Sequence, residues 1–449
     1  MNRIHLISLG CPKNLVDSER MWGLLQENGY QLVNQATEAD LIIINTCGFI
    51  RPAKEESIEV VLKAAQAKET GRCKGLIMAG CLAERYREEL PREIPEVDLF
   101  LRLKDVPQIV KYCDLLLGKR RPIKQSARRS LLTLPHTAYL RIADGCNNHC
   151  SYCAIPIIRG PCQSRNMESI IEEAKDLASS GVKELNLIAQ DTTNYGVDLY
   201  GRQRLEELIR SLSEIEKIRW IRLLYTHPAH ILPSLIKSWP DVPKLCPYLD
   251  MPIQHISNPI LKLMNRRVRK EDIVSLIERL REAVPDLTLR TSIIVGFPGE
   301  SEVHFEELLD FVAQARFDRL GAFIYSREEG TSAARLPDQV PEEVKSERLD
   351  RLMQLQQQIS RQRNEALIGQ EIEVLIDQKV EGRYIGRSPA DAPEIDGRVI
   401  ITPSEPANSP QDPQWVETQA ARALRHIQVG EFCRVRITGA TEYDLLGEI

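Results

Sequence analysis

The chain has 449 residues, of which 43% are hydrophobic and 27% are charged, and its formal net charge is −5. This length exceeds a single ordinary hydrophobic core, so two to four domains are expected. No apolar run approaches the ~20 residues that a membrane-spanning helix needs, and the start "MNRIHLISLGC" lacks a signal peptide's long apolar segment. We therefore expect a cytoplasmic protein that does not enter a membrane. In that compartment, eleven cysteines indicate metal binding or redox chemistry rather than disulfides.

The first ~115 residues alternate short apolar runs with helical patterns, as is typical of a parallel α/β sheet. We expect buried strands and intervening helices here, with strands at 5–9, 41–45 and 75–79 and helices at 14–29, 52–69 and 83–90. The basic segment 118–130 then reads as a linker. We favour a solvated connector, with a contact to nucleic acid or to an acidic partner as the alternative.

From about residue 137 the alternation restarts and continues for six β–α units, which predicts an incomplete barrel with functional residues at its strand ends. The expected strands are 138–143, 184–189, 220–225, 248–254, 287–296 and 320–326. A charged helix at 341–369 separates this barrel from the tail. From about residue 371, short alternating strands with Gly and Pro turns predict a small antiparallel barrel.

Three cysteines, Cys146, Cys150 and Cys153, lie within the stretch "DGCNNHCSYCAIP". Their spacing also fits one face of a helix, but the glycine and the Asn-Asn-His run between them are typical of a loop. Thiols gathered in a polar loop directly after a strand are placed to bind a metal. A structural zinc site with His149 or Cys162 as its fourth ligand is the alternative.

A second trio becomes visible when strand ends are compared. Cys11, Cys47 and Cys81 each come directly after a predicted parallel strand. Since such strand ends meet at one edge of the sheet, the three thiols are expected to lie close together. A buried structural role is common for a single cysteine but does not explain three repeats of one placement. The other five cysteines show no such pattern and are interpreted as structural.

The motifs around both trios resemble those of a known family. The Cys-x3-Cys-x2-Cys loop, with the aromatic Tyr152 before its last cysteine, resembles the radical S-adenosylmethionine signature. The stretches "SLGCPKNLVDSE", "NTCGFI" and "AGCLAERY" resemble the N-terminal motifs of the radical methylthiotransferases, and "TSIIVGFPGE", "YSREEGT" and "GRSPADAPEIDG" extend the match over nearly the whole chain. The resemblance is to the branch that modifies ribosomal protein S-twelve of the small subunit.

This resemblance implies an α/β fold in three domains joined by a linker. The expected ranges are a parallel, Rossmann-like domain (1–117), the basic linker (118–134), an incomplete TIM-like barrel (135–366) and a TRAM-like, OB-like β-barrel that binds the target (367–449).

The same resemblance implies that each trio holds a 4Fe–4S cluster with one iron left open. S-adenosylmethionine would complete the cluster of Cys146, Cys150 and Cys153 and give a radical that removes hydrogen from the β-carbon of an aspartate. The cluster of Cys11, Cys47 and Cys81 would hold the sulfur, which a second S-adenosylmethionine methylates before transfer. An electron donor and a sulfur source are also needed.

Six further residues are expected to contact S-adenosylmethionine on the same grounds. They are Tyr152, Gln190, Asp191, Thr291, Gly296 and Glu300. Gln190 and Asp191 end a predicted strand, where a polar cap of the next loop is an equally good interpretation. Gly296 would allow the backbone to approach a ligand closely, and Tyr152 could instead simply pack.

Two alternative functions remain open from the sequence. Related enzymes with the same two trios act on transfer RNA, and their tail barrel should carry a basic face. Here residues 371–449 contain 14 Asp and Glu against 8 Lys and Arg, a net charge of −6, which suits a basic protein partner better than phosphates. The other alternative is a zinc-binding module without catalytic activity.

Metal analysis of anaerobically purified protein separates the enzyme from the zinc module. We expect brown protein with about eight irons per chain, because two filled cubic clusters hold four irons each. Colourless protein that contains zinc instead of iron would contradict this expectation.

Overall fold

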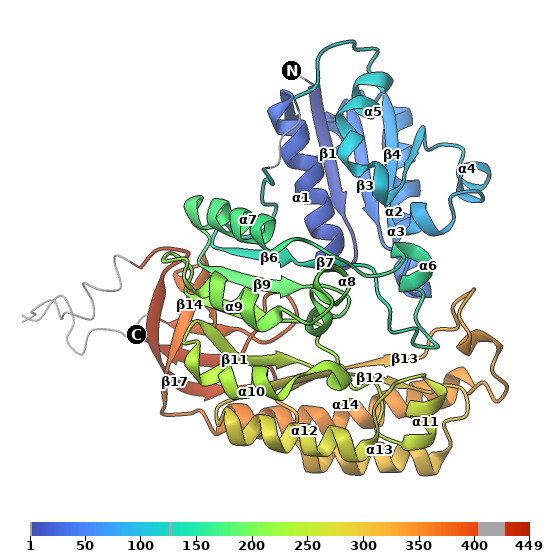
Figure 1. The fold of residues 1–449 in the computed structure, drawn as a ribbon. Helices are drawn as coiled ribbons and strands as arrows, with labels where there is room; N and C mark the ends of the chain where they lie inside the picture. Colours follow the sequence, from blue (N-terminus) through green and yellow to red (C-terminus); the bar gives the residue numbers. More distant parts are fainter. Residues whose placement is uncertain (1, 125–127, 403–426) are drawn as a thin grey trace, which may run out of the picture.

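The computed structural model describes residues 2–124, 128–402 and 427–449, which form three main sheets (Figure 1). Two of these sheets are parallel, and the third closes into a barrel. A fourth, small sheet pairs β7 (Ala143–Asp144) with β8 (Gln163–Ser164). Within these residues, no helix combines the length and the apolar character that crossing a membrane requires.

The N-terminal sheet has five parallel strands in the order β2-β1-β3-β4-β5. Its strands are β1 (Asn2–Ser8), β2 (Tyr30–Leu32), β3 (Leu41–Thr46), β4 (Gly75–Gly80) and β5 (Leu99–Leu101), and its helices are α1 (Pro12–Glu27), α2 (Arg51–Thr70), α3 (Cys81–Arg85), α4 (Leu90–Glu93) and α5 (Ile109–Leu116). Successive residues of β3 point into two different cores, with Ile42 in one and Ile43 in the other. Helices therefore cover both faces of the sheet, and this is why β3 and β4 are apolar throughout.

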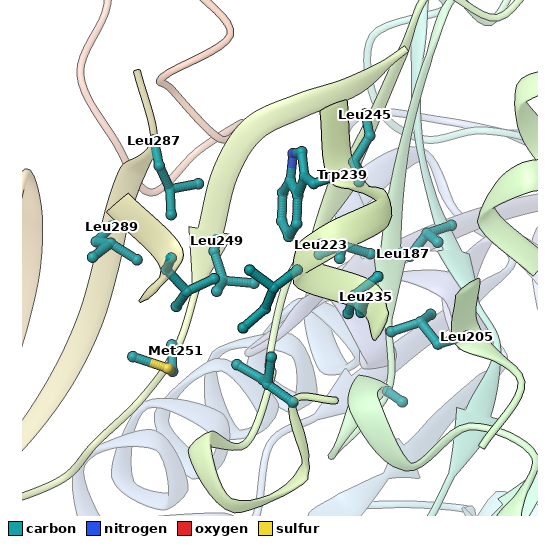
Figure 2. Close-up of a cluster of buried hydrophobic side chains, with 14 of the residues drawn as sticks. Leu187, Leu205, Leu223, Leu235, Trp239, Leu245, Leu249, Met251, Leu287 and Leu289 are labelled. Carbon is teal, nitrogen blue, oxygen red and sulfur yellow. The ribbon is translucent and has the colours of Figure 1, made fainter. Parts of the chain in front are cut away.

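The second sheet has six parallel strands that neighbour one another in chain order. They are β6 (Thr137–Arg141), β9 (Glu184–Ile188), β10 (Trp220–Leu223), β11 (Leu245–Asp250), β12 (Thr288–Val295) and β13 (Arg319–Ile324). The helices between and after these strands are α6 (Ile155–Arg159), α7 (Met167–Ser179), α8 (Val197–Tyr200), α9 (Leu205–Ser213), α10 (Pro233–Ser238), α11 (Asn258–Leu263), α12 (Lys270–Ala283), α13 (Glu302–Ala315) and α14 (Glu342–Glu365). One face of the sheet packs on these helices through a large core that includes Leu187, Leu223, Leu249 and Leu289 (Figure 2).

The tail barrel lies against the other face of the six-stranded sheet. Its strands are β14 (Glu371–Val380), β15 (Arg383–Arg387), β16 (Val399–Thr402), β17 (Phe432–Ala440) and β18 (Leu445–Glu448). The loop 388–397, between β15 and β16, crosses this face. Tyr139 of β6 donates a hydrogen bond to the Pro393 carbonyl, and Tyr248 of β11 donates one to Asp396. At the far strand, Arg319 of β13 donates to Asp391. The loop therefore contacts both edge strands of the sheet.

A buried group of charges joins the barrel to the same face. The fully buried Glu184 carboxylate accepts hydrogen bonds from the guanidinium groups of Arg222 and Arg387. Arg387 also donates to Asp377 at 2.7 Å. Burial opposes ionisation of Glu184, but Arg387 and Arg222 outweigh it and lower the pKa of this carboxyl to about 2. The carboxylate therefore holds together two cations that would otherwise be buried beside each other.

Most described residues of the basic linker are exposed, as the favoured prediction of a solvated connector requires, but Arg129 differs. The side chain of Arg129 is only 2% exposed, and its guanidinium lies 3.3 Å from Glu19 of α1 and 3.3 Å from Glu173 of α7. Arg121 donates to Asp114 of α5. The solvated reading is thus wrong for Arg129, whose guanidinium the carboxylates of the flanking helices attract, whereas residues 120–124 and 128 are exposed as predicted. Residues 125–127 of the linker lie outside the described residues.

Most predicted elements are confirmed, including the N-terminal parallel sheet, the six-stranded parallel sheet and the small tail barrel. The prediction missed the short strands β2 and β5, which are too brief to show an alternating pattern. The helix expected at 83–90 was also wrong, since α3 ends at Arg85 and α4 starts at Leu90. The domain ranges themselves stay predictions.

Replacing Glu184 with Gln tests the buried charge group. We expect the variant to lose about 3–5 kcal/mol of unfolding free energy, because two buried guanidinium groups lose their anionic partner. In the native chain this contribution is present above the unfolded-state pKa of about 4.5. It is lost as the pH falls toward the folded-state pKa of about 2, so the native chain and the variant should converge in acid. Chemical denaturation at several pH values measures both effects.

The matched control is Glu373→Gln, which breaks an exposed ion pair across the same junction. Arg219 and Glu373 are joined at 2.6 Å, but their side chains are 49% and 39% exposed. This control should cost no more than about 1 kcal/mol. Equal losses in the two variants would show that burial of Glu184 does not determine its contribution.

Candidate functional site

The structure brings Cys11, Cys47 and Cys81 together at one edge of the N-terminal sheet. They follow β1, β3 and β4, which are neighbours in the sheet, and the aligned register pairs Thr46 with Gly80. Gly10 has a φ of +86°, and a side chain there would come within 2.9 Å of Cys47 Sγ. The loops that carry the three thiols therefore touch, as the placement after parallel strands predicted.

Asn14 and Arg159 connect these loops, although the sequence analysis did not single out either residue. The Asn14 amide donates hydrogen bonds to the carbonyls of Leu9 and Thr46, and its oxygen accepts one from the Cys81 thiol at 3.2 Å. Arg159 donates to the same Asn14 oxygen at 2.7 Å and lies 3.4 Å from Cys81 Sγ. Asn14 stands within the quoted "GCPKN" motif, whereas no spacing rule marks Arg159.

Burial makes two thiols of this trio, those of Cys47 and Cys81, hard to ionise. It raises the pKa of Cys81 to about 12 and that of Cys47 to about 11, and the other cysteines of the trio add to the shift. The Arg159 guanidinium acts in the opposite direction at both thiols. Thiolates at this position therefore need a further positive charge close by, as a metal centre would supply.

Cys146, Cys150 and Cys153 lie in the loop between β7 and α6. The Cys153 backbone N–H donates to the Cys150 carbonyl at 3.1 Å, and the Asn148 backbone N–H donates to Cys146 Sγ at 3.4 Å. Burial raises the pKa of Cys146 to about 11 and that of Cys153 to about 12, with Cys150 contributing to both shifts. The prediction of a loop rather than a helical face is confirmed.

Helix α3, which begins at Cys81, packs against α6, which begins two residues after Cys153 (Figure 1). Ala154, directly after Cys153, packs with Ile158 and Cys81 in one buried cluster. Arg159 ends α6 and reaches Asp17 of α1 as well as Cys81. The N-terminal sheet and the six-stranded sheet therefore present their cysteines to a common region.

The chemistry of each trio fits an iron–sulfur cluster. Among the residues the structure describes, no three His, Cys, Asp or Glu side chains surround a point where one metal ion would sit. A cubic cluster has a different requirement, because each thiolate binds its own iron and the sulfurs need not converge. Three buried or half-buried thiols with a guanidinium group beside them match that requirement. At the trio of Cys146, Cys150 and Cys153, Arg266 supplies the guanidinium, 3.8 Å from Cys150 Sγ.

Of the six residues expected to contact S-adenosylmethionine, Gln190 and Asp191 lie beside the loop that carries Cys146. Asp191 accepts a hydrogen bond from Asn148 at 2.7 Å. Asp191, Asn148 and Cys146 line a cavity of about 190 Å³. Burial opposes ionisation of Asp191, but its hydrogen bond with His230 lowers the pKa to about 2. Gln190 donates to Asp144, while its own side-chain oxygen is buried and lacks a partner among the described residues.

The other four residues are engaged within the protein. Tyr152 packs beside Phe297 and Tyr325. The Thr291 hydroxyl donates to the Met251 carbonyl. The Gly296 N–H donates to the Glu300 carboxylate at 3.0 Å, and this carboxylate is also bound by Arg348 of α14. These contacts leave a role at a ligand untested.

Models of three protein families match this chain. They are described as Uncharacterized protein family UPF0004 (residues 3–102), the Radical SAM superfamily (140–312) and the TRAM domain (368–449). The chain also resembles the solved structure of TsrM from Kitasatospora setae, a radical S-adenosylmethionine methyltransferase, with a TM-score of 0.53 and 12% identity over 74% of each chain. At this identity the likeness concerns the fold alone.

Curated relatives match over their full length. A protein of Desulforamulus reducens, named ribosomal protein uS12 methylthiotransferase RimO, is 48% identical to this chain and aligned over 100% of both. A protein of the same name from Pelotomaculum thermopropionicum is also 48% identical, over 99% of both chains. Together with the radical SAM and TRAM matches, these relatives show that the chain belongs to the RimO family of radical S-adenosylmethionine methylthiotransferases.

Proposed function

We propose that this enzyme adds a methylthio group to the β-carbon of an aspartate in ribosomal protein uS12, in the cytoplasm. The observation that carries the proposal is the packing of Cys81, from one trio, against Ala154, the residue that directly follows Cys153 of the other. A reaction that removes hydrogen at one centre and delivers sulfur from another needs both centres beside one carbon atom. The names of the full-length relatives supply the target protein.

In this proposal each trio holds one 4Fe–4S cluster. Cys146, Cys150 and Cys153 hold the first, and Cys11, Cys47 and Cys81 hold the second. When bound, the clusters and S-adenosylmethionine would supply the radical, the methyl group and the sulfur, which no side chain can provide. Tyr152, Gln190, Asp191, Thr291, Gly296 and Glu300 are proposed to line the S-adenosylmethionine site.

The chain's own residues would set the electrostatics of this site. Arg159 and Arg266 place positive charge beside the thiolates, which a buried anionic cluster needs. Asn14 fixes the loops of Cys11 and Cys47 relative to each other through its two amide hydrogen bonds. The apolar contact of Ala154 and Ile158 with Cys81 keeps water away from the region between the trios.

The target protein is also supported by the charge of the tail. A net charge of −6 over residues 371–449 would attract a ribosomal protein, which is basic because it binds RNA. Phosphates of transfer RNA would be repelled by the same charge. The transfer RNA alternative thus has weaker support than uS12.

An Arg159→Met variant tests the proposed second cluster. We expect iron bound by Cys11, Cys47 and Cys81 to be lost to a chelator about tenfold faster. Mutation of a residue that contacts a metal ligand typically lowers metal affinity 10–100-fold. The measurement uses anaerobic protein carrying Cys146→Ala, so that the N-terminal trio is the cluster under observation. Arg159→Lys, which keeps the charge, should lose iron at an intermediate rate.

The matched control is Arg165→Met. Arg165 bonds Glu173 at 2.6 Å and donates to the Arg141 carbonyl, so it is a partly buried arginine of the same region without a cysteine partner. Iron loss from this control should equal that of the Cys146→Ala parent. An Arg159→Met variant that keeps its iron as long as the control would contradict the assigned role.

A substrate assay tests the proposed activity itself. Reduced, cluster-loaded enzyme is incubated with S-adenosylmethionine and sulfide, and offered either uS12 or transfer RNA. We expect mass spectrometry to show a methylthio group on an aspartate of uS12 and none on the RNA. Modification of RNA alone would overturn the choice of target.

A further inference from the structure

Lys13 is a largely buried residue whose ammonium group has no protein acceptor among the described residues. The residue is 6% exposed, and its Nζ lies 2.9 Å from the centre of the Tyr225 ring. Within the described residues no oxygen lies at hydrogen-bonding or ion-pairing distance from this nitrogen. Contact with an aromatic face attracts a cation, but it leaves the three N–H donors of the ammonium without protein partners among the described residues.

The carboxylates nearest to Lys13 already have other partners. Asp250 accepts hydrogen bonds from Arg290 at 2.9 Å and from the Tyr225 backbone N–H at 2.9 Å. Asp144 accepts hydrogen bonds from Arg159 and Gln190. Both carboxylates influence Lys13 through space but are held away from it. A buried ammonium in this state is stabilised strongly by any anion that enters.

The position of Lys13 places such an anion at the reacting centre. Lys13 stands two residues after Cys11, in the first turn of α1. Tyr225, beneath it, follows β10 at the carboxyl edge of the six-stranded sheet. Tyr225 also has a φ of +59°, an uncommon backbone conformation for a residue with a large side chain, and its N–H bond to Asp250 holds it there. The ammonium thus lies between the N-terminal trio and the strand ends.

We propose that Lys13 binds the side-chain carboxylate of the target aspartate and thereby positions the β-carbon that receives the methylthio group. This inference rests on the proposed function. The carboxylate carbon of aspartate is bonded directly to the β-carbon. Binding of the carboxylate therefore leaves the β-carbon little freedom to move. The same binding selects an acidic side chain over a neutral one, because an uncharged residue would leave the ammonium buried without an anion.

A double-mutant cycle between enzyme and substrate tests the inference. Anaerobic, cluster-loaded full-length enzyme with S-adenosylmethionine is titrated with uS12, and with uS12 in which the modified aspartate is replaced by asparagine. For the native enzyme we expect the dissociation constant to be about tenfold higher for the asparagine protein, the size of one charge-assisted hydrogen bond. Lys13→Met should bind both proteins equally weakly, because the discriminating charge is gone.

Two controls keep the outcome decisive. Lys111→Gln removes a lysine from the exposed face of α5 and should retain the tenfold discrimination. Lys13→Gln serves as a second neutral variant, and iron content and the cluster absorption spectrum are recorded for every protein. The inference is overturned if either Lys13 variant still discriminates tenfold. It is equally overturned if both variants lose their iron, because Lys13 would then serve cluster retention.

The titration also separates this inference from the proposed function. A native enzyme that methylthiolates no aspartate of uS12 contradicts the proposed function. A native enzyme that modifies uS12, together with Lys13 variants that discriminate as it does, contradicts only the role of Lys13. A further readout is the ratio of 5′-deoxyadenosine formed to methylthio groups transferred. This ratio should rise severalfold in Lys13→Met, because a loosely held β-carbon is missed more often.

Discussion

Burial of the cysteine thiols is the constraint on which the rest of the site depends. Burial disfavours the charged thiolate form at Cys81 and at Cys153 alike. Guanidinium groups compensate part of this cost, and a bound metal centre would compensate the remainder. The local fold follows from this requirement: Arg159 and Arg266 come from helix ends and loops far from the cysteines in sequence, yet each lies beside a sulfur.

The same requirement explains why the N-terminal sheet and the six-stranded sheet are docked so firmly. Arg159 belongs to α6 of the second unit, but its hydrogen bonds reach Asn14, Asp17 and Cys81 of the first. Glu328, in the loop after β13, repeats the pattern by accepting from Lys54 and Arg85 of the N-terminal unit. Buried charges that are partnered across the junction make the relative placement of the two trios a property of the folded chain.

Much of this architecture can be predicted from the sequence, for identifiable physical reasons. Strands such as β3 and β4 are buried on both faces and read as continuous apolar runs, and the cysteines directly after them mark a shared edge. The six β–α units were recognisable for the same reason. Short strands such as β2 lack a pattern because three residues cannot show a period.

Arg159 and Lys13 were not recognised, since their importance comes from contacts between elements far apart in sequence. Within the linker, Arg129 was misjudged because its charge was interpreted without the carboxylates that it meets, Glu19 and Glu173.

The loop 388–397 determines how the tail barrel can work. It crosses the concave side of an open sheet and is anchored at β6, β11 and β13 by side chains that point away from the helices. A barrel anchored in this way keeps its position on the sheet and cannot move away to bind a protein and bring it to the cysteines. A protein bound by the barrel would therefore lie at a constant distance from the cysteines. If the barrel binds the target as proposed, the distance between the bound surface and the modified side chain would be fixed, and only an aspartate at that distance would reach the cysteines.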